Sequence, residues 1–181
     1  MLGLEFDVLP ADIDETYLNG EPAPAHAERL AREKALAVAK DQPDSLVIGS
    51  DTVVVLDREV LGKPRDREHA IEMLMKLEGR AHRVETGVAV ARNGALLSGV
   101  ESVKVYFRPF DRRLAELYVN TGEPMDKAGA YGIQGHGSAL VERIDGDFYA
   151  VMGLPVAQLL SLINAHGFQY TFTGLEPVDV P

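Results

Sequence analysis

The stretch Leu46-Val47-Ile48-Gly49-Ser50-Asp51-Thr52-Val53-Val54-Val55-Leu56 decides the fold class. Its two apolar, β-branched runs, 46–48 and 53–56, are typical of buried strands, and they flank the small segment 49–52. Asp51 therefore lies inside or beside a buried strand, where an ionised carboxylate is unfavourable unless it is paired. Two interpretations stay open for Asp51: a functional carboxylate, or a structural one that accepts backbone N–H bonds.

A helix is predicted ahead of this strand and a hairpin after it. Pro24 precedes a helix that runs to about Lys40, with apolar residues at helical spacing. Lys34 shares the edge of the apolar stripe, so either its stem packs while its ammonium reaches water, or it has a functional partner. Asn93-Gly94 favours a type I′ turn between strands 84–91 and 95–107. These elements predict an α/β fold with a mixed, partly antiparallel sheet flanked by helices.

Capping and turn residues predict the remaining elements. The predicted strands are a short one in which Leu4, Phe6 and Val8 alternate with polar residues, one at Val60-Leu61 after a turn at Asp57-Arg58, and two short ones around Asp145-Gly146. One predicted helix is capped by Asp66 and ended by Gly79, and another runs from Pro155 to Gly167. A third is capped by Asp111, with Leu114, Leu117 and Tyr118 inward. Nothing resembling a linker precedes the tail Gly174 to Pro181. We therefore expect a single domain over residues 1–181.

Composition excludes several functional classes. The 181 residues include no cysteine, which rules out disulfides, thiolate catalysis and cysteine-bound metal centres. The net charge of −10 opposes binding to duplex nucleic acid, whose affinity comes largely from Lys and Arg. No apolar run is long enough to span a bilayer, and the first ten residues lack the order of a signal peptide. We expect a cytoplasmic protein without a membrane partner.

Other polar residues sit where a ligand could reach them. Lys63 follows a strand end between Gly62 and Pro64, either facing a crevice or as an ordinary surface lysine. The glycine-rich stretch 129–137 is not a Walker loop, but it allows backbone close to a ligand. Within it, Gln134 offers a donor and an acceptor that could read a base edge, unless the stretch is only a tight loop.

The histidines and the acidic loop carry weaker indications. The histidines show no metal-ligand spacing, so exposed surface positions are expected for all of them: His26, His69, His82, His136 and His166. Asp12, Asp14 and Glu15 could hold a magnesium ion through oxygen ligands, although acidic loops are more often merely solvated.

Taken together, four blocks resemble the Maf family in order and separation over nearly the whole chain. They are Arg29-Leu30-Ala31-Arg32-Glu33-Lys34-Ala35, Gly49-Ser50-Asp51-Thr52-Val53-Val54, Leu61-Gly62-Lys63-Pro64, and Asp126-Lys127-Ala128-Gly129-Ala130-Tyr131-Gly132-Ile133-Gln134-Gly135. The resemblance implies a homodimer with a fold similar to that of the inosine triphosphate pyrophosphatases (Maf/Ham1). It also implies hydrolysis of a nucleoside triphosphate to the monophosphate and pyrophosphate, with Mg²⁺ or Mn²⁺.

The same resemblance implies roles for individual residues. Asp51 would be the proton acceptor that activates water, and Lys34 and Lys63 would hold the triphosphate. Glu15 would help to bind the metal or to orient the water. A second set would bind the substrate and set its specificity: Thr52, Gln134 and Lys127. Thr52 and Gln134 resemble the residues found at these positions in the subgroup that acts on dTTP and UTP. Modified pyrimidine nucleotides are further substrates expected for this chain.

The chain departs from the family pattern at its start. Family members open with a strand and a Ser-x-Ser-Pro-Arg-Arg block, whereas Met1-Leu2-Gly3-Leu4 matches a later point in that pattern. We therefore expect an N-terminally truncated member that lacks an anion-binding helix N-terminus and two arginines. The alternative function is a catalytically impaired nucleotide-binding or regulatory module, related to the septum or cell division.

Overall fold

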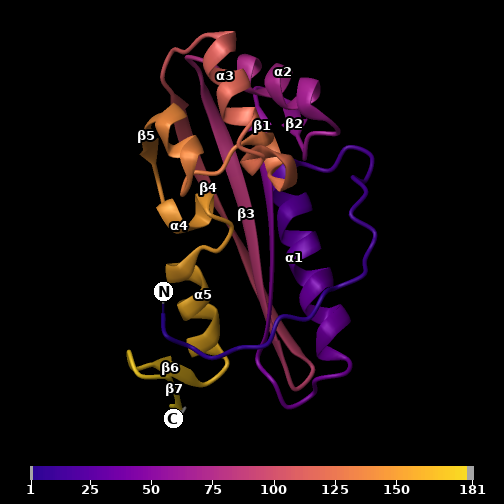
Figure 1. Ribbon diagram of the computed structural model, residues 1–181. Helices are drawn as coiled ribbons and strands as arrows, with labels where there is room; N and C mark the ends of the chain where they lie inside the picture. The colour runs from indigo at the N-terminus through magenta and orange to yellow at the C-terminus, as the bar shows by residue number, and fades with distance from the viewer. Residues whose placement is uncertain (1, 179–181) are drawn as a thin grey trace. The chain divides into compact units, whose positions relative to one another are not determined.

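The computed structural model describes residues 2–178; residue 1 and residues 179–181, which end the predicted tail, lie outside the described part. Its helices and 3₁₀ turns are α1 (Ala23–Ala39), α2 (Arg67–Leu77), α3 (Arg112–Val119), η1 (Glu123–Asp126), η2 (Ala128–Ala130), η3 (His136–Leu140), α4 (Phe148–Val151) and α5 (Val156–Ala165) (Figure 1). Its strands are β1 (Val47–Leu56), β2 (Glu59–Leu61), β3 (Ala81–Arg92), β4 (Ala95–Phe107), β5 (Val141–Asp145), β6 (Phe168–Tyr170) and β7 (Leu175–Pro177). None of these helices is long and apolar enough to cross a membrane.

The strands form one large sheet and one small one. The large sheet has the order β2-β1-β3-β4-β5, and β6 pairs with β7 in the small one. β1 with β2, β4 with β5 and β6 with β7 are antiparallel pairs. Asn93 and Gly94 have φ angles of 49° and 78°, as the predicted type I′ turn between β3 and β4 requires. The predicted α/β fold with a partly antiparallel sheet flanked by helices is confirmed.

The chain forms two compact units, each built from interleaved segments. Unit 1 contains residues 1–51, 87–100 and 154–181, and unit 2 contains residues 52–86 and 101–153. The long strands β1, β3 and β4 contribute residues to both units. The expectation of a single domain over residues 1–181 stays a prediction.

In unit 1, helices cover both faces of β3. Ala89 and Ala91 pack in one cluster with Ala31 and Ala35 of α1, whereas Val88 and Val90 pack in another with α5. Successive strand residues point to opposite faces, so this alternation assigns α1 and α5 to opposite sides of the strand.

In unit 2, the core forms where α2 and α3 pack side by side (Figure 1). Both helices begin as predicted: the Asp66 carboxylate accepts the backbone N–H of His69, and the Asp111 carboxylate accepts that of Leu114. Buried residues of this core include Ile71, Leu74, Leu77, Phe107 and Leu140.

Three predictions about local elements are wrong. Residues 4–8 form no strand, and Phe6 and Val8 are exposed, because an alternating pattern needs a neighbouring strand to pair with. The helical spacing predicts that Leu117 points inward, but Leu117 is 56% exposed, and the buried residues of α3 are Ala115, Tyr118 and Val119. After Asp145-Gly146 the chain enters α4 rather than a second strand, because Asp147 caps that helix through the backbone N–H of Tyr149.

Surface positions were also wrongly predicted for two histidines, since His26 and His82 are buried. The Nε2 atom of His82 lies 2.8 Å from the Tyr131 hydroxyl. Within residues 2–178, the Nδ1 atom of His82 has no hydrogen-bond partner. Burial lowers the pKa of His82 to about 4. The ring is therefore neutral in the folded protein at neutral pH.

This buried histidine makes stability depend on pH in the acidic range. The folded-state pKa lies below the unfolded value near 6.5, so protons bind the unfolded state preferentially between these values. We expect the wild type to lose about 2 kcal/mol of unfolding free energy through His82 between pH 7 and pH 5. Urea unfolding of His82→Gln should show a shallower loss over this interval. Equal pH dependence of the two proteins would contradict the neutral buried ring.

Candidate active site

Lys34 and Asp51 form a close ion pair within unit 1. Lys34 Nζ donates to Asp51 Oδ1 at 2.7 Å, and the exposed fractions of the two side chains are 22% and 12%. The lysine lies in α1 beside the buried Leu30, Ala31 and Ala35. Asp51 lies in β1, which is a single strand from Val47 to Leu56. The functional interpretation of Lys34, as a residue with a specific partner, fits this geometry better than a stem that only packs.

Glu15 joins the pair from the loop that precedes α1. Lys34 Nζ lies 2.7 Å from Glu15 Oε1, and the Glu15 side chain is 52% exposed. One ammonium therefore holds two carboxylates, one nearly buried and one at the surface. The structure brings together three of the residues predicted for catalysis.

Direct backbone packing between α1 and β1 fixes this arrangement. A Cβ atom on Gly49 would lie 2.7 Å from the backbone nitrogen of Ala35 and closer still to the backbone oxygen of Ala31. Gly49 and Asp51 are two residues apart on one strand and so face the same side. The missing side chain at Gly49 lets α1 approach that side closely, which places Lys34 over Asp51.

The electrostatics of the pair favour a basic carboxylate next to a charged ammonium. Burial raises the pKa of Asp51 above the usual range, and the hydrogen bond from Lys34 offsets part of that rise. Burial alone would lower the pKa of Lys34, but its hydrogen bonds to Asp51 and Glu15 outweigh this effect and raise it. Lys34 therefore stays charged, and Asp51 binds a proton more readily than an exposed aspartate.

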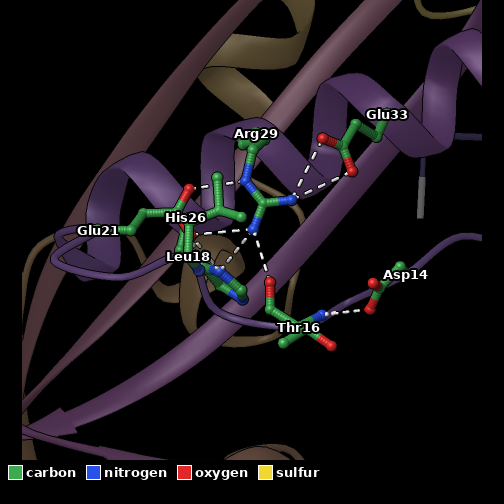
Figure 2. A network of polar contacts seen from close by, with 7 residues as sticks. All are labelled: Asp14, Thr16, Leu18, Glu21, His26, Arg29 and Glu33. Atoms are coloured by element: carbon green, nitrogen blue, oxygen red, sulfur yellow. Dashed lines mark hydrogen bonds and ion pairs between the residues drawn. The ribbon is translucent and has the colours of Figure 1, made fainter.

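A polar clamp holds the loop that carries Glu15 against α1 (Figure 2). Arg29 donates to both carboxylate oxygens of Glu21, from Nε at 2.7 Å and from Nη2 at 2.9 Å. Arg29 Nη2 also donates to the backbone oxygen of Thr16, the residue after Glu15, at 3.1 Å. The hydrogen bonds from Arg29 are the main cause that lowers the pKa of Glu21 to about 2. Such bidentate, charge-assisted pairs are among the stronger polar contacts in proteins.

Aromatic stacking extends the clamp. The rings of Tyr17 and His26 are parallel within 7° with centroids 3.4 Å apart, and His26 Nδ1 lies 2.9 Å from Glu21 Oε2. Burial, with the negative charges of Asp51 and Glu21, raises the pKa of Tyr17 to about 12. Sequence reasoning missed Glu21, His26 and Tyr17, because their contacts join a loop to a helix without any periodic pattern.

Loss of the clamp should loosen the loop measurably. Leu18 donates its backbone N–H to Glu21 Oε2 at 3.2 Å. In Arg29→Ala we expect hydrogen exchange at the Leu18 amide to be faster by about tenfold, because Glu21 loses its main partner. The matched control is Arg32→Ala on the same helix, since Arg32 donates to Ser98 Oγ at 2.9 Å rather than to the loop. Equal exchange rates in the two variants would show that Arg29 does not anchor the loop.

In unit 2, Lys63 and Lys127, the two lysines predicted to contact the substrate there, lie on neighbouring segments. The backbone N–H of Gly129 donates to the oxygen of Gly62 at 3.1 Å, which joins the end of β2 to the glycine-rich stretch. Lys127 Nζ pairs with Asp126 Oδ1 at 2.8 Å. This bond chiefly, with a smaller contribution from the charge of Lys63, lowers the pKa of Asp126. Lys63 is exposed.

The predicted specificity residues differ in their surroundings. Thr52 is partly buried, and its Oγ1 lies 3.0 Å from Thr86 Oγ1, which in turn donates to the backbone oxygen of Ala150 at 2.8 Å. Gln134 is exposed within the glycine-rich stretch. Thr52 is thus held in one position, whereas the Gln134 side chain is open to a ligand.

The carboxylates around Lys34 are oxygen ligands of the kind that a divalent metal such as Mg²⁺ prefers. Among residues 2–178, no group of three or more His, Asp or Glu side chains could form a metal cage. The carboxylates of Glu15 and Asp51 instead converge on the Lys34 ammonium. Mg²⁺ usually binds one or two carboxylates together with water and substrate phosphates, and the half-exposed carboxylate of Glu15 fits that mode. Asp14 instead accepts the backbone N–H of Thr16 at 2.9 Å.

Comparison with known proteins points to one family. The family described as Maf-like protein matches residues 1–166. The dTTP/UTP pyrophosphatase of Aquifex aeolicus is 45% identical over 164 residues, covering 91% of this chain and 86% of the relative. The protein of the same name from Symbiobacterium thermophilum is 46% identical over 173 residues, covering 96% of this chain and 89% of the relative. That from Pyrococcus abyssi is 47% identical over 166 residues, covering 91% of this chain and 88% of the relative.

Proposed function

The chain belongs to the Maf family, and on that premise we propose that it hydrolyses dTTP and UTP to the monophosphate and pyrophosphate. The observation that carries this proposal is the Lys34–Asp51 pair, a nearly buried carboxylate with a raised pKa against a charged ammonium. Phosphoryl chemistry needs these two functions, a base that places water and a cation that stabilises charge on phosphate oxygens.

In the proposed reaction, water attacks the α-phosphorus and the bond between that phosphorus and the α,β-bridging oxygen breaks. The water oxygen ends on the nucleoside monophosphate, and the bridging oxygen leaves with pyrophosphate. Asp51 accepts the proton that water loses, and this proton then passes to solvent. Lys34 and Lys63 stabilise the negative charge that develops on the phosphate oxygens, because positioned cations offset the charge that builds up in the transition state.

We also propose that Glu15 holds a divalent metal, Mg²⁺ or Mn²⁺, together with the substrate phosphates. Bound there, the metal would neutralise phosphate charge and favour departure of pyrophosphate. Glu15 is suited to this role because its carboxylate is half exposed on an anchored loop.

Base selectivity is proposed to come from Thr52, Gln134 and Lys127. The carboxamide of Gln134 offers one acceptor and two donors, which can pair with the N3–H and O4 groups of uracil or thymine. Cytosine presents a different donor and acceptor pattern, so it is expected to be a poorer substrate.

Pyrophosphate release from dTTP, UTP, CTP and GTP tests this function, with Mg²⁺ or Mn²⁺ present and with the metal removed by EDTA. Turnover of dTTP and UTP above the other nucleotides, abolished by EDTA, is the expected result. Tight binding of dTTP without turnover would instead support the non-catalytic nucleotide-binding module. The homodimer and the cytoplasmic location stay predictions, and light scattering after gel filtration tests the first.

A further inference from the structure

Three glycines around Gln134 are closely approached by other side chains without adopting a left-handed conformation. Gly132, Gly135 and Gly137 lie outside the positive-φ region, where glycine is usually needed. Their Cβ positions are instead occupied. A Cβ on Gly137 would lie 2.6 Å from the Tyr118 hydroxyl, one on Gly132 would lie 2.8 Å from Lys127 Cε, and one on Gly135 would overlap Glu123 Oε2.

Two of these side chains, Tyr118 and Glu123, also bind the backbone of the stretch. Tyr118 of α3 accepts the N–H of Gly132 through its hydroxyl oxygen at 3.0 Å. Glu123 of η1 accepts the N–H of His136 at Oε2 and that of Gly137 at Oε1, at 2.8 and 3.1 Å. The Tyr118 hydroxyl donates to Glu123 Oε1 at 2.8 Å, which joins the two contacts into one unit.

This arrangement holds the backbone on both sides of Gln134. The first attachment is at Gly132, two residues before Gln134, and the second begins at His136, two residues after it. The Gln134 side chain itself is exposed. The Tyr118 side chain is nearly buried, so its hydroxyl has a fixed position. Backbone N–H bonds from Gly137 and His136, with the Tyr118 hydroxyl, outweigh burial and lower the pKa of Glu123, which keeps it an acceptor at neutral pH.

We propose that Tyr118 and Glu123 are positioning residues that set nucleobase selectivity by fixing the backbone around Gln134. This inference rests on the proposed function, because it assigns Gln134 the reading of the base. A carboxamide discriminates between uracil and cytosine only when its donor and acceptor are held in register with the base edge. Small displacements of a positioning group have large kinetic effects, so loss of either attachment should reduce the preference for UTP over CTP.

The test is the ratio of kcat/KM for UTP to kcat/KM for CTP. Tyr118→Phe keeps the ring and removes both hydroxyl bonds, and Glu123→Gln keeps the shape but offers one oxygen to three donors. In both variants we expect the ratio to fall about tenfold, through KM and kcat for UTP rather than through a uniform loss of rate. The matched control is Glu116→Gln, whose carboxylate contacts Arg112 on the exposed side of α3.

The outcomes separate this inference from the proposed function. A merely structural role would lower the melting temperature and slow both nucleotides equally, leaving the ratio unchanged, and that result would overturn the inference. Gln134→Ala must also lower the ratio, and an unchanged ratio there would overturn it as well. If Tyr118→Phe does not fold by circular dichroism, Glu123→Gln decides.

If the wild type hydrolyses no nucleotide, the proposed function fails and the inference is tested by binding. The dissociation constants of UTP and CTP are then compared by calorimetry for the wild type and both variants. An unchanged ratio of the two constants, or no binding of either nucleotide, would overturn the inference.

Discussion

Asp51→Asn lowers kcat for dTTP and UTP by about 10³-fold, which is the loss expected when a general base is removed. Asparagine keeps the size of the side chain and can accept a hydrogen bond from Lys34, but it cannot take a proton from water. The measurement is steady-state pyrophosphate release with saturating nucleotide and metal. In the wild type, activity should fall as pH drops through the pKa of Asp51, which burial has raised.

The same variant should not lose stability. The pKa of Asp51 is higher in the folded protein than in the unfolded chain. Asp51 therefore stabilises the fold below its unfolded-state pKa, and this stabilisation is lost as the pH rises through its folded-state pKa. At pH 7 the ionised carboxylate is therefore less favourable than a neutral group, and Lys34 keeps its contact with Glu15. The melting temperature of Asp51→Asn should equal or exceed that of the wild type. Full activity in this variant would remove Asp51 from the mechanism; Asp41→Asn, an exposed change beyond α1, is the control.

Gly49→Ala destabilises the fold by roughly 3 kcal/mol, the upper part of the range for overpacking a well-packed contact. The added methyl group meets backbone atoms of Ala31 and Ala35, which cannot move aside as a flexible side chain does. For a chain of this size the expected fall in melting temperature is about 10 °C. Hydrolysis should fall too, because the change forces apart the elements that carry Lys34 and Asp51.

Gly174→Ala is the matched control for this glycine. A Cβ on Gly174 would meet no atom within 4 Å, and its φ lies outside the positive region. The melting temperature of this variant should equal that of the wild type. A Gly49→Ala protein as stable as the control would show that α1 does not lie directly on the backbone of β1.

Several features followed from the sequence because they depend on neighbours a few positions away. The Asn93-Gly94 turn needs two positive φ angles, and the caps Asp66 and Asp111 each accept an N–H three residues later. The helix Ala23–Ala39 follows from its apolar spacing. Asp51 stood out because an acidic residue in an apolar strand needs a partner.

Partners distant in the chain could not be read in this way. Lys34 and Asp51 are 17 positions apart, and Tyr118 and Gly132 are 14 apart. No periodicity links such residues, and only the approach of one element to another creates the contact. The same reason explains the errors: residues 4–8 alternate like a strand but have no strand beside them, and His26 and His82 are buried by segments that their own neighbours do not specify.

The sequence by itself determined the hairpin and the helices α1, α2, α3 and α5, the family resemblance, and the types of group available for chemistry. Only the tertiary structure decided which of these groups meet. It placed Glu15 on Lys34 through a loop clamped by Arg29, and it bound the backbone around Gln134 to Tyr118 and Glu123. The physical reason is range: backbone conformation is set by local sterics and hydrogen bonds, whereas a site is set by packing between segments that the chain brings together only on folding.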